Sequence, residues 1–340
     1  MAQGRERPRV AFAMRSDELA ATVFTAHALA RLARVADIVD DRVLTEFSSE
    51  RARRVLADID VLITCWGSPV IDAGVLDAAP RLRLVAHSAG TVKGHLERAV
   101  WERGIAVTTA AQANGEPVAE YTLAFILLSA KGALASAQDF SRLQDMTAKT
   151  RMPGQVGNLG STVGIIGASR IGRRVLELLA PFHHRRLISS PDLSPAQAEA
   201  LGATLVSLER LMAESDVVSL HAPVLPSTIG MIGRAQFAAM KTDATFINTA
   251  RGVLVDHDAL REEAGSGRIN AVLDVTNPEP LPAGDPLYDL PNVVLTPHIA
   301  GSMGNELPLM GDFAVAEVEL FAAGAPLNYP VTLADLERMA

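Results

Sequence analysis

Short apolar runs of strand length alternate with helical patterns along most of the chain, and this alternation restricts the fold more than any other feature. In the first third of the sequence such runs occupy 10–13, 60–64, 82–86 and 105–108. A second series follows at 162–166, 186–189, 216–220, 244–248, 269–274 and 292–295. Buried parallel strands read as continuous apolar runs because helices cover both faces of their sheet. The sequence therefore predicts an α/β fold with two doubly wound parallel sheets, each in its own domain.

Two long helical patterns lie outside this alternation. The first covers 116–131 and is entered at Gly115-Glu116-Pro117, with the proline expected in the first helical turn. We expect this helix to link the two sheets. The second covers 305–323, after the second sheet is complete, and is expected to pack back against the first domain.

The composition indicates a folded protein that binds a small molecule rather than a nucleic acid or a membrane. Of the 340 residues, 49% are hydrophobic and 21% are charged, which is enough apolar material for two cores. The net charge of −8 disfavours nucleic acid and anionic membranes, because both attract clustered positive charge. The longest apolar stretch, 121–130, is too short to span a bilayer, and the single cysteine, Cys65, excludes an internal disulfide and a thiolate metal cluster. We therefore expect a cytoplasmic protein without a metal site.

The segment 162–172, TVGIIGASRIG, predicts a phosphate-binding turn. A strand ends at Gly167, and Arg170 and Ile171 open a helix whose N-terminal N–H groups can bind a dinucleotide pyrophosphate. The G-x-G-x-x-G fingerprint has glycine where Ser169 stands, so the serine side chain must turn aside. An ordinary glycine turn between a strand and a helix is the alternative interpretation.

Polar side chains follow the strands of the second series. His221, Arg251, Asp274 and His298 each come at or just after a carboxyl end, which is where open α/β sheets bind ligands. Taken singly, each is an ordinary loop or ion-pair residue. Together with the glycine turn they predict one site.

These residue types suit hydride transfer between a nicotinamide and a carbon that bears oxygen beside a carboxylate. Arginine binds a carboxylate through its planar fork and stays charged, which fits Arg251. Histidine exchanges protons near neutrality, which fits His298 as the acid/base. A carboxylate fixes the tautomer of such a histidine, and Glu279 in the Asn277-Pro278-Glu279-Pro280 loop fits this role. Arg251, Glu279 and His298 are thus the candidate catalytic residues.

Three blocks resemble the D-isomer-specific 2-hydroxyacid dehydrogenases, which include glycerate, phosphoglycerate and D-lactate dehydrogenases. They are Ile247-Asn248-Thr249-Ala250-Arg251-Gly252 with Leu254-Val255-Asp256, Leu273-Asp274-Val275 through Glu279-Pro280, and Leu295-Thr296-Pro297-His298-Ile299-Ala300-Gly301. The resemblance implies the same three catalytic residues and reduction of a small 2-oxo acid, or the reverse oxidation, as in hydroxypyruvate/glyoxylate reductases and phosphoglycerate dehydrogenases. It also implies two sets of binding residues. The cofactor set is Gly167, Ser169, Arg170, Ile171, Ser190, His221, Pro223, Thr228, Thr249, Ala250, Asp274 and Gly301, with Asp274 near the nicotinamide; the substrate set is Ser88, Ala89, Gly90 and Arg251, with backbone amides of the 88–90 loop holding the carboxylate. Trp66, at the end of a strand of the first domain, is expected from its position to shape the substrate pocket, and plain core packing is the alternative.

The resemblance further implies how the domains are organised. A dinucleotide-binding domain, 109–302, is inserted into a flavodoxin-like substrate-binding domain made of 1–108 and 303–340. Similar proteins are usually homodimers that exchange the long helix, here 116–131. A buried core helix is the alternative interpretation of that segment.

Two questions stay open at the level of sequence. Ser190 stands where an acidic residue would bind the ribose hydroxyls of NAD, so NAD(H) is expected while NADP(H) is permitted; Asp192 is then read as a turn residue before the helix cap Ser194. Other activities also fit the family. A dinucleotide-sensing corepressor-like protein and a phosphite-type dehydrogenase are the alternatives, whereas formate dehydrogenases carry glutamine where Glu279 stands.

The remaining histidines lack partners at metal-ligand spacing. We expect solvated surface positions for them: His27, His95, His183, His184 and His257.

Overall fold

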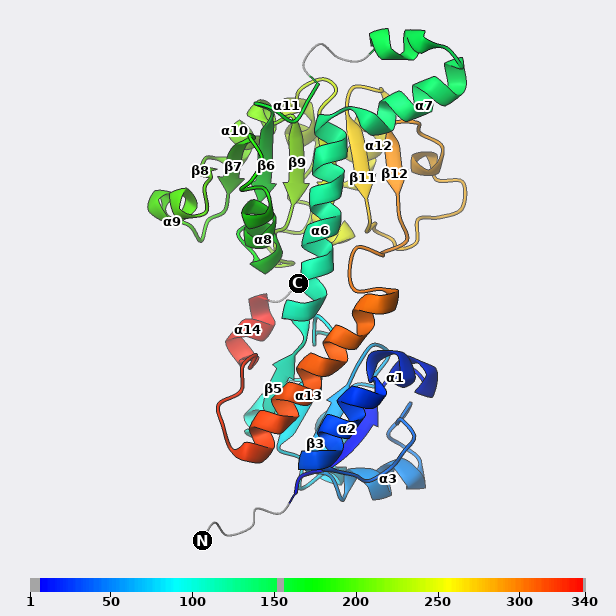
Figure 1. Ribbon diagram of the computed structural model, residues 1–340, viewed down its shortest axis with the longest axis vertical. Coiled ribbons are helices and arrows are strands. Elements are labelled where there is room, and N and C mark those ends of the chain that lie inside the picture. The colour runs from blue at the N-terminus through cyan, green and yellow to red at the C-terminus, as the bar shows by residue number, and fades with distance from the viewer. Residues whose placement is uncertain (1–6, 152–155, 339–340) are drawn as a thin grey trace. The chain divides into compact units, whose positions relative to one another are not determined.

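The computed structural model describes residues 7–151 and 156–338. The chain divides into two compact units (Figure 1). Unit 1 contains the residues up to Gly115 and those from Ser302 on, and unit 2 contains Glu116–Gly301. The chain thus leaves unit 1 once and returns to it once. Each unit is built on a parallel sheet, which confirms the predicted fold class.

Unit 1 has a five-stranded parallel sheet. Its order is β2 (Asp37–Ile38), β1 (Arg9–Ala13), β3 (Val61–Thr64), β4 (Leu84–His87) and β5 (Ala106–Thr109). This order is that of a flavodoxin-like sheet.

Helices cover both faces of the sheet of unit 1. They are α1 (Asp17–Val23), α2 (Ala26–Val35), α3 (Glu50–Leu56), α4 (Ala73–Ala78), α5 (Ala99–Glu102), α13 (Leu307–Ala323, after η4, Gly304–Glu306) and α14 (Leu333–Arg338). Alternate residues of β1 enter opposite cores: Phe12 packs with α1, α2 and α13, whereas Ala11 faces the core containing α3 and α4. A Cβ on Gly311 would overlap the carbonyl oxygen of Val23, so a residue without a side chain lets α13 lie directly against α1.

Unit 2 has a seven-stranded parallel sheet. Its order is β12 (Val293–Leu295), β11 (Asn270–Leu273), β10 (Thr245–Asn248), β9 (Val217–Leu220), β6 (Thr162–Ile166), β7 (Arg185–Ser189) and β8 (Thr204–Leu205). Counted from β6 this is the strand order of a dinucleotide-binding sheet with one strand added. The order reverses between β6 and β9, and ligands bind such sheets beyond the carboxyl ends at that point.

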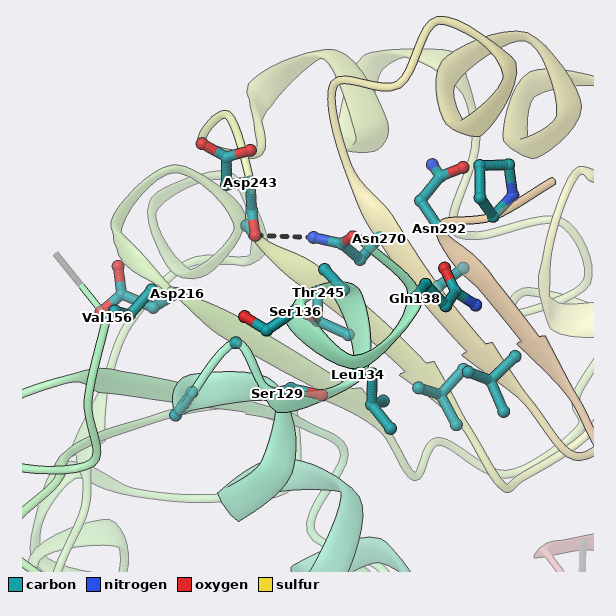
Figure 2. A pocket seen from close by; sticks show the side chains of 18 of the residues that line it. Ser129, Leu134, Ser136, Gln138, Val156, Asp216, Asp243, Thr245, Asn270 and Asn292 are labelled. Atoms are coloured by element: carbon teal, nitrogen blue, oxygen red, sulfur yellow. Dashed lines mark hydrogen bonds between the residues drawn. The ribbon is translucent and has the colours of Figure 1, made fainter. Parts of the chain in front are cut away.

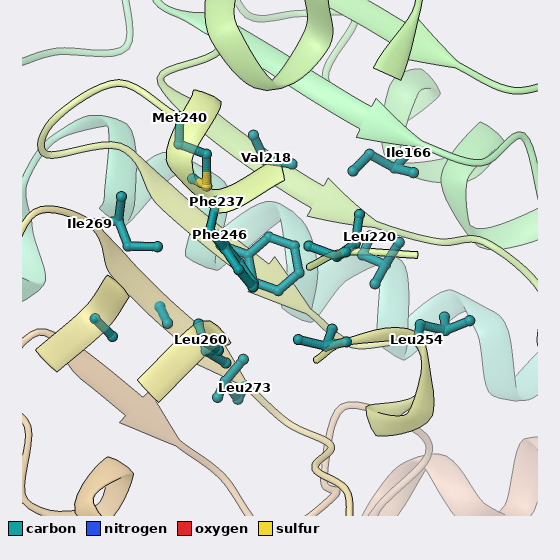
Figure 3. Packing of buried hydrophobic residues seen from close by; sticks show 14 of the residues in the cluster. Ile166, Val218, Leu220, Phe237, Met240, Phe246, Leu254, Leu260, Ile269 and Leu273 are labelled. Carbon is teal, nitrogen blue, oxygen red and sulfur yellow. The ribbon is translucent and has the colours of Figure 1, made fainter. Parts of the chain in front are cut away.

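The helices of unit 2 also lie in two layers. They are α6 (Ala111–Ala130), which begins in unit 1, α7 (Ala133–Leu143), α8 (Arg170–Leu178), α9 (Pro195–Ala200), α10 (Leu208–Glu214), α11 (Arg234–Ala239) and α12 (His257–Gly265), with 3-10 turns η1 (Met146–Arg151), η2 (Gly252–Leu254) and η3 (Pro286–Tyr288). Figure 1 shows α6 and α8 on one face and α10 to α12 on the other. On the second face Phe237 of α11 meets Phe246 of β10 edge to face, with ring centroids 5.3 Å apart (Figure 3).

The predicted strands lie within about a residue or two of the observed ones. Two edge strands, β2 and β8, were not predicted, because two residues carry no periodic signal. The predicted start of the linking helix was wrong: α6 begins at Ala111 and contains Pro117 in its interior. The hydroxyl of Thr109 accepts a hydrogen bond from the Ala111 amide (3.2 Å), and the helix buries Ala113, Val118 and Ile126. This burial offsets the backbone hydrogen bond that the proline lacks.

Among the described residues no single helix has the length and apolar character needed to cross a membrane. The pair α6 and α7, bent by 58°, meets those two criteria together.

Candidate active site

The turn after β6 requires glycine at two positions. Gly167 has a φ of 95°, and a Cβ there would lie 2.7 Å from the amide nitrogen of Ala222. A Cβ on Gly172 would overlap the carbonyl oxygen of Gly167. Both glycines therefore let the start of α8 pack against the ends of β6 and β9, where the strand order reverses.

Ser169 is the N-cap of α8. Its hydroxyl accepts a hydrogen bond from the Gly172 amide (3.3 Å), so the side chain turns toward the helix, as the sequence predicted. Within the described part of the chain the amides of Arg170 and Ile171 have no hydrogen-bond partner. They stand at the N-terminus of a helix of nine residues, where the helix dipole favours an anion. These features fit a dinucleotide pyrophosphate.

His221 is a buried, neutral histidine beside this turn. Its amide donates to the Ile166 carbonyl (2.7 Å) and its Nε2 is hydrogen-bonded to the hydroxyl of Ser219 (2.8 Å). Burial lowers the pKa of His221 to about 3. Farther along, the hydroxyl of Thr228 donates to the Pro223 carbonyl (2.7 Å) and closes the loop that follows β9.

The loop after β10 is held by Asn248. The Asn248 side chain accepts from the Ala250 amide (3.0 Å) and donates to the Arg251 carbonyl (3.1 Å). The hydroxyl of the next residue, Thr249, is hydrogen-bonded to the Thr122 hydroxyl on α6 (2.9 Å). The sequence analysis did not assign Asn248 a role, although its place between a strand and an arginine is typical of an Asx turn.

Arg251 is partly buried and forms no salt bridge among the described residues. Its Nη1 donates to the Ala250 carbonyl (2.6 Å). Burial lowers the pKa of the Arg251 guanidinium, and the nearby carboxylate of Glu279 opposes this effect. The remaining N–H groups of Arg251 can therefore bind an anionic ligand.

His298 and Glu279 form a direct pair. The Nδ1 of His298 donates to Oε1 of Glu279 at 2.6 Å, and their side chains are 49% and 42% exposed. The loop before Glu279 contacts the loop of Arg251, because a Cβ on Gly252 would overlap the Thr276 carbonyl oxygen. The structure thus brings together the three predicted catalytic residues within unit 2.

Asp274 anchors the loop that carries His298. Its buried carboxylate accepts hydrogen bonds from the amides of Ile299 (2.8 Å) and Ala300 (2.9 Å) and from the hydroxyl of Thr296 (2.7 Å). Its carbonyl accepts from the His298 amide (3.0 Å). His298 has a φ of 55°, a strained conformation for a residue with a side chain, and these bonds hold it there. Gly301 ends the loop at the last position of unit 2.

Tyr121 on α6 extends this network. Its hydroxyl is hydrogen-bonded to the Thr296 hydroxyl at 2.7 Å, which in turn donates to Asp274. Burial raises the pKa of Tyr121. The sequence analysis assigned no role to Tyr121 or Thr296, because nothing in the chain order brings α6 to the loop after β12.

Ser190 follows β7 and is half-buried. Ser194 is the N-cap of α9 and forms a capping box with Gln197, as predicted, and Asp192 lies exposed in the turn before it. The ribose end of the proposed cofactor site therefore has a hydroxyl where an acidic residue was expected.

The loop after β4 in unit 1 agrees with the sequence analysis in part. The Ser88 amide and hydroxyl both donate to the Thr64 carbonyl (2.7 and 2.8 Å), which removes this amide from the set expected to bind a carboxylate. Within the described residues the amides of Ala89 and Gly90 have no partner. Their carbonyls accept from the hydroxyl of Thr109, which fixes the loop. Trp66 is partly buried in unit 1 and packs beside Ala110, Ala113 and Met310.

The expectation that the other histidines are solvated was wrong for two of them. His184 and His257 are each 7% exposed. His184 Nδ1 is hydrogen-bonded to the Ser161 hydroxyl (2.8 Å), and both ring nitrogens of His257 are bonded to backbone groups. A histidine beside a helix cap or a strand carries no sequence signal of burial. No group of three or more potential metal ligands occurs in the described ranges.

A cavity of about 270 Å³ lies at the amino ends of the strands of unit 2, on the side of the sheet opposite the loops that carry Arg251 and His298. Ser136 and Gln138 of α7 line it together with Asp216, Thr245 and Asn270 at the amino ends of strands (Figure 2). None of the predicted site residues borders this cavity.

Comparison with known proteins agrees with this geometry. Residues 123–300 match the family described as D-isomer specific 2-hydroxyacid dehydrogenase, NAD binding domain. The chain is 33% identical over 294 residues to D-3-phosphoglycerate dehydrogenase of Mycobacterium tuberculosis, covering 86% of this chain and 55% of that protein. It is 34% identical over 270 residues to glyoxylate reductase of Korarchaeum cryptofilum, covering 78% and 81%.

A solved structure of a phosphoglycerate oxidoreductase from Rhizobium etli shares the fold with a TM-score of 0.76 at 28% identity, covering 95% of this chain and 97% of that one. The chain spans about half the length of the curated phosphoglycerate dehydrogenases that it matches. The matched segment contains the glycine turn, Arg251, Glu279 and His298. The chain belongs to the D-isomer specific 2-hydroxyacid dehydrogenase family and contains its NAD binding domain.

Proposed function

We propose that this chain is a nicotinamide-dependent oxidoreductase that interconverts a small 2-oxo acid and the D-2-hydroxy acid. The observation that carries the proposal is the 2.6 Å hydrogen bond between His298 and Glu279, whose loop contacts the loop of the partly buried Arg251. An acid/base and an anion-binding cation in one place meet the two protein requirements of this reaction.

Each residue has a separate task. Arg251 binds the substrate carboxylate and polarises the neighbouring carbonyl, because its free N–H groups match two oxygens. His298 gives a proton to the developing alkoxide during reduction and takes it back during oxidation. Glu279 is a positioning residue that holds the Nδ1 proton and thereby leaves Nε2 to exchange the substrate proton. Reduction needs the protonated ring and is expected to favour lower pH than oxidation.

The cofactor site is proposed at the glycine turn. The amides of Arg170 and Ile171 bind the pyrophosphate, and Gly167, Ser169 and Gly172 shape the turn. When bound, NAD(H) or NADP(H) supplies or accepts the hydride. The rest of the proposed cofactor set comprises Ser190, His221, Pro223, Thr228, Thr249, Ala250, Asp274 and Gly301.

In unit 1 the amides of Ala89 and Gly90 are proposed to donate hydrogen bonds to an anionic ligand, since they have no hydrogen-bond partner in the described part of the chain. Trp66 is proposed to limit the size of the substrate. The names of the relatives point to glyoxylate or 3-phosphoglycerate as the class of substrate, and the family resemblance adds hydroxypyruvate.

A substrate panel tests the proposal. Nicotinamide absorbance is followed with glyoxylate, hydroxypyruvate, pyruvate and bulkier 2-oxo acids, with NADH and NADPH in parallel, and the reverse reaction is followed with 3-phosphoglycerate. Turnover of at least one of these acids is expected. NADH binding without any turnover would instead favour a dinucleotide sensor, and turnover confined to phosphite would favour a phosphite-type dehydrogenase.

We also propose that the protein is a homodimer formed through α6 and α7. Support comes from apolar side chains exposed on α6, α7 and the following turn η1: Leu128 is 42%, Phe140 51% and Met146 67% exposed. Light scattering after size exclusion measures the mass. A monomer at micromolar concentration would contradict the proposal.

The proposed compartment is the cytoplasm. Cys65 is a buried free thiol, which fits a reducing environment. Fractionation of the native host tests this assignment.

A further inference from the structure

His257 joins the two loops that carry Arg251 and Glu279. It is the first residue of α12, directly after the N-cap Asp256, and it is 7% exposed. Its Nε2 accepts a hydrogen bond from the Asn277 amide at 3.2 Å. Because Nε2 is then an acceptor, the proton of the neutral ring is on Nδ1, which donates to the Val255 carbonyl at 3.1 Å. Both ring nitrogens are therefore in use.

The two loops meet at a second point as well. A Cβ on Gly252 would overlap the carbonyl oxygen of Thr276. Val255 closes the turn that begins after Arg251, and Asn277 stands shortly before Glu279. His257 thus connects the backbone beside the cation with the backbone beside the carboxylate.

We propose that His257 is a positioning residue that fixes Glu279 against His298. The Asn277 amide hydrogen bond holds the 276–279 loop on α12, and the loop in turn places Oε1 of Glu279 at hydrogen-bond distance from Nδ1 of His298. This role rests on the proposed function, because it deepens the assignment of Glu279.

The surroundings keep the ring neutral, as this role requires. The pKa of His257 is lowered, chiefly by burial and also by Arg261, whereas the hydrogen bond to the Val255 carbonyl and the carboxylates of Asp285 and Asp256 act in the opposite direction. Arg261 and Asp285 already pair with each other, with Nη2 and Oδ2 2.6 Å apart. A protonated His257 would place an N–H against the N–H of Asn277 and break the connection.

Two substitutions separate the two hydrogen bonds of His257. The side-chain oxygen of glutamine reaches the place of Nε2, so His257→Gln keeps an acceptor for the Asn277 amide. Asparagine reaches only the place of Nδ1, so His257→Asn loses that acceptor. His257→Leu removes both bonds while keeping an apolar side chain of similar bulk in the buried site. His184→Gln and His184→Asn are the matched controls, since His184 is equally buried in unit 2 but bonded to Ser161.

The measurements are kcat and KM across pH, the Kd of NADH by fluorescence, the melting temperature, and the NMR resonance of the His298 ring N–H. We expect His257→Asn and His257→Leu to lower kcat about 10-fold, shift its pH profile and lose the low-field N–H resonance, with the Kd of NADH unchanged. His257→Gln and both His184 variants should keep the wild-type pH profile and resonance.

Several results would overturn the proposal. One is a folded His257→Asn or His257→Leu protein with the wild-type resonance and pH profile, and if one of the two does not fold, the other decides. Another is a His257→Gln protein as impaired as His257→Leu. The NMR arm does not need turnover, so a failure of the proposed function is recognised separately.

Discussion

Polar residues lie at both ends of the strands of the seven-stranded sheet in unit 2, and they differ in whether their hydrogen-bonding groups already have partners. We call the side with the amino ends of the strands the amino edge and the side with the carboxyl ends the carboxyl edge. At the amino edge they satisfy one another: Asp216 accepts from Lys241 (2.8 Å) and from the Thr162 amide (2.7 Å), and Asn270 donates to the Asp243 carbonyl (2.9 Å). At the carboxyl edge, within the described residues, Arg251 has no salt bridge, and of the two ring nitrogens of His298 only Nδ1 has a hydrogen-bond partner. Side-chain groups that are free to bind an anion or exchange a proton therefore lie at the carboxyl edge.

One cavity of unit 2 lies at the amino ends of the strands, away from Arg251 and His298. In parallel sheets the loops after the strands are free to vary and the helix N-termini point to that side, which places ligands at the carboxyl ends. Strand direction therefore places the proposed site at the carboxyl ends, whereas this cavity lies at the amino ends. Substitutions matched across the two edges test this comparison.

The largest effect is expected for His298→Ala. Loss of a general acid lowers kcat by about 10²- to 10⁴-fold, and cofactor binding should survive because the glycine turn is untouched. Steady-state kinetics and NADH titration measure both quantities. Asn270→Ala at the amino edge is the control and should keep kcat within about twofold. Equal losses in the two variants would remove the distinction between the edges.

Arg251→Ala is expected to have the next largest effect. Removing hydrogen bonds from a charged group to the substrate should lower kcat/KM by about 10²-fold. Lys241→Ala removes the amino-edge cation, which is already paired with Asp216, and kcat/KM should stay near the wild-type value. An unchanged kcat/KM in Arg251→Ala would show that this guanidinium does not bind substrate.

The residues at the carboxyl edge also show what could be predicted from sequence. Because all strands of the sheet are parallel, their carboxyl ends lie on the same side. The residues that follow them, Arg251, Asp274 and His298, could therefore be placed together from the sequence. The glycine turn could be predicted for a similar reason, since it combines a strand end, a helix start and two close approaches in one short segment.

Hydrogen bonds between distant segments could not be predicted in this way. Asp274 was expected near the nicotinamide, but its binding of the Ile299 and Ala300 amides depends on how a loop turns back after β12. The burial of His257 depends on the packing of the Asn277 loop against α12, and the Ser88 amide is taken by a neighbouring strand. These are tertiary contacts without a local pattern, and periodicity does not report them.

Gly252→Ala is expected to have a smaller effect, on stability. The added Cβ would overlap the Thr276 carbonyl oxygen at the carboxyl edge, so the two loops must separate, at a cost of about 1–3 kcal/mol in the free energy of unfolding. Gly265→Ala, at the other end of α12, meets nothing within 4 Å and is the matched control. Denaturant unfolding compares the two proteins. Comparable midpoints would indicate that the loop contact at Gly252 is loose.

The smallest expected effect concerns the pH dependence of stability and tests His221. Its folded-state pKa is about 3 while the ordinary value is 6.5, so between these values the unfolded chain binds a proton that the folded chain does not. The neutral ring therefore makes its full contribution to the free energy of unfolding above pH 6.5, and this contribution is lost as the pH falls toward 3. His221→Gln, which keeps a hydrogen-bonding group beside Ser219, should make the loss of stability shallower by about 1.4 kcal/mol per pH unit in this window.

Unfolding midpoints of His221→Gln measured from pH 6.5 downward provide this comparison. His183→Gln, at an exposed histidine near the amino edge, should follow the wild-type curve. His87 in unit 1 is likewise buried, with its pKa lowered to about 3, so the wild-type slope contains at least two such contributions and His221→Gln removes one of them. Superimposable curves for His221→Gln and wild type would mean that His221 takes up its proton without unfolding, and that the carboxyl edge admits water beneath the glycine turn.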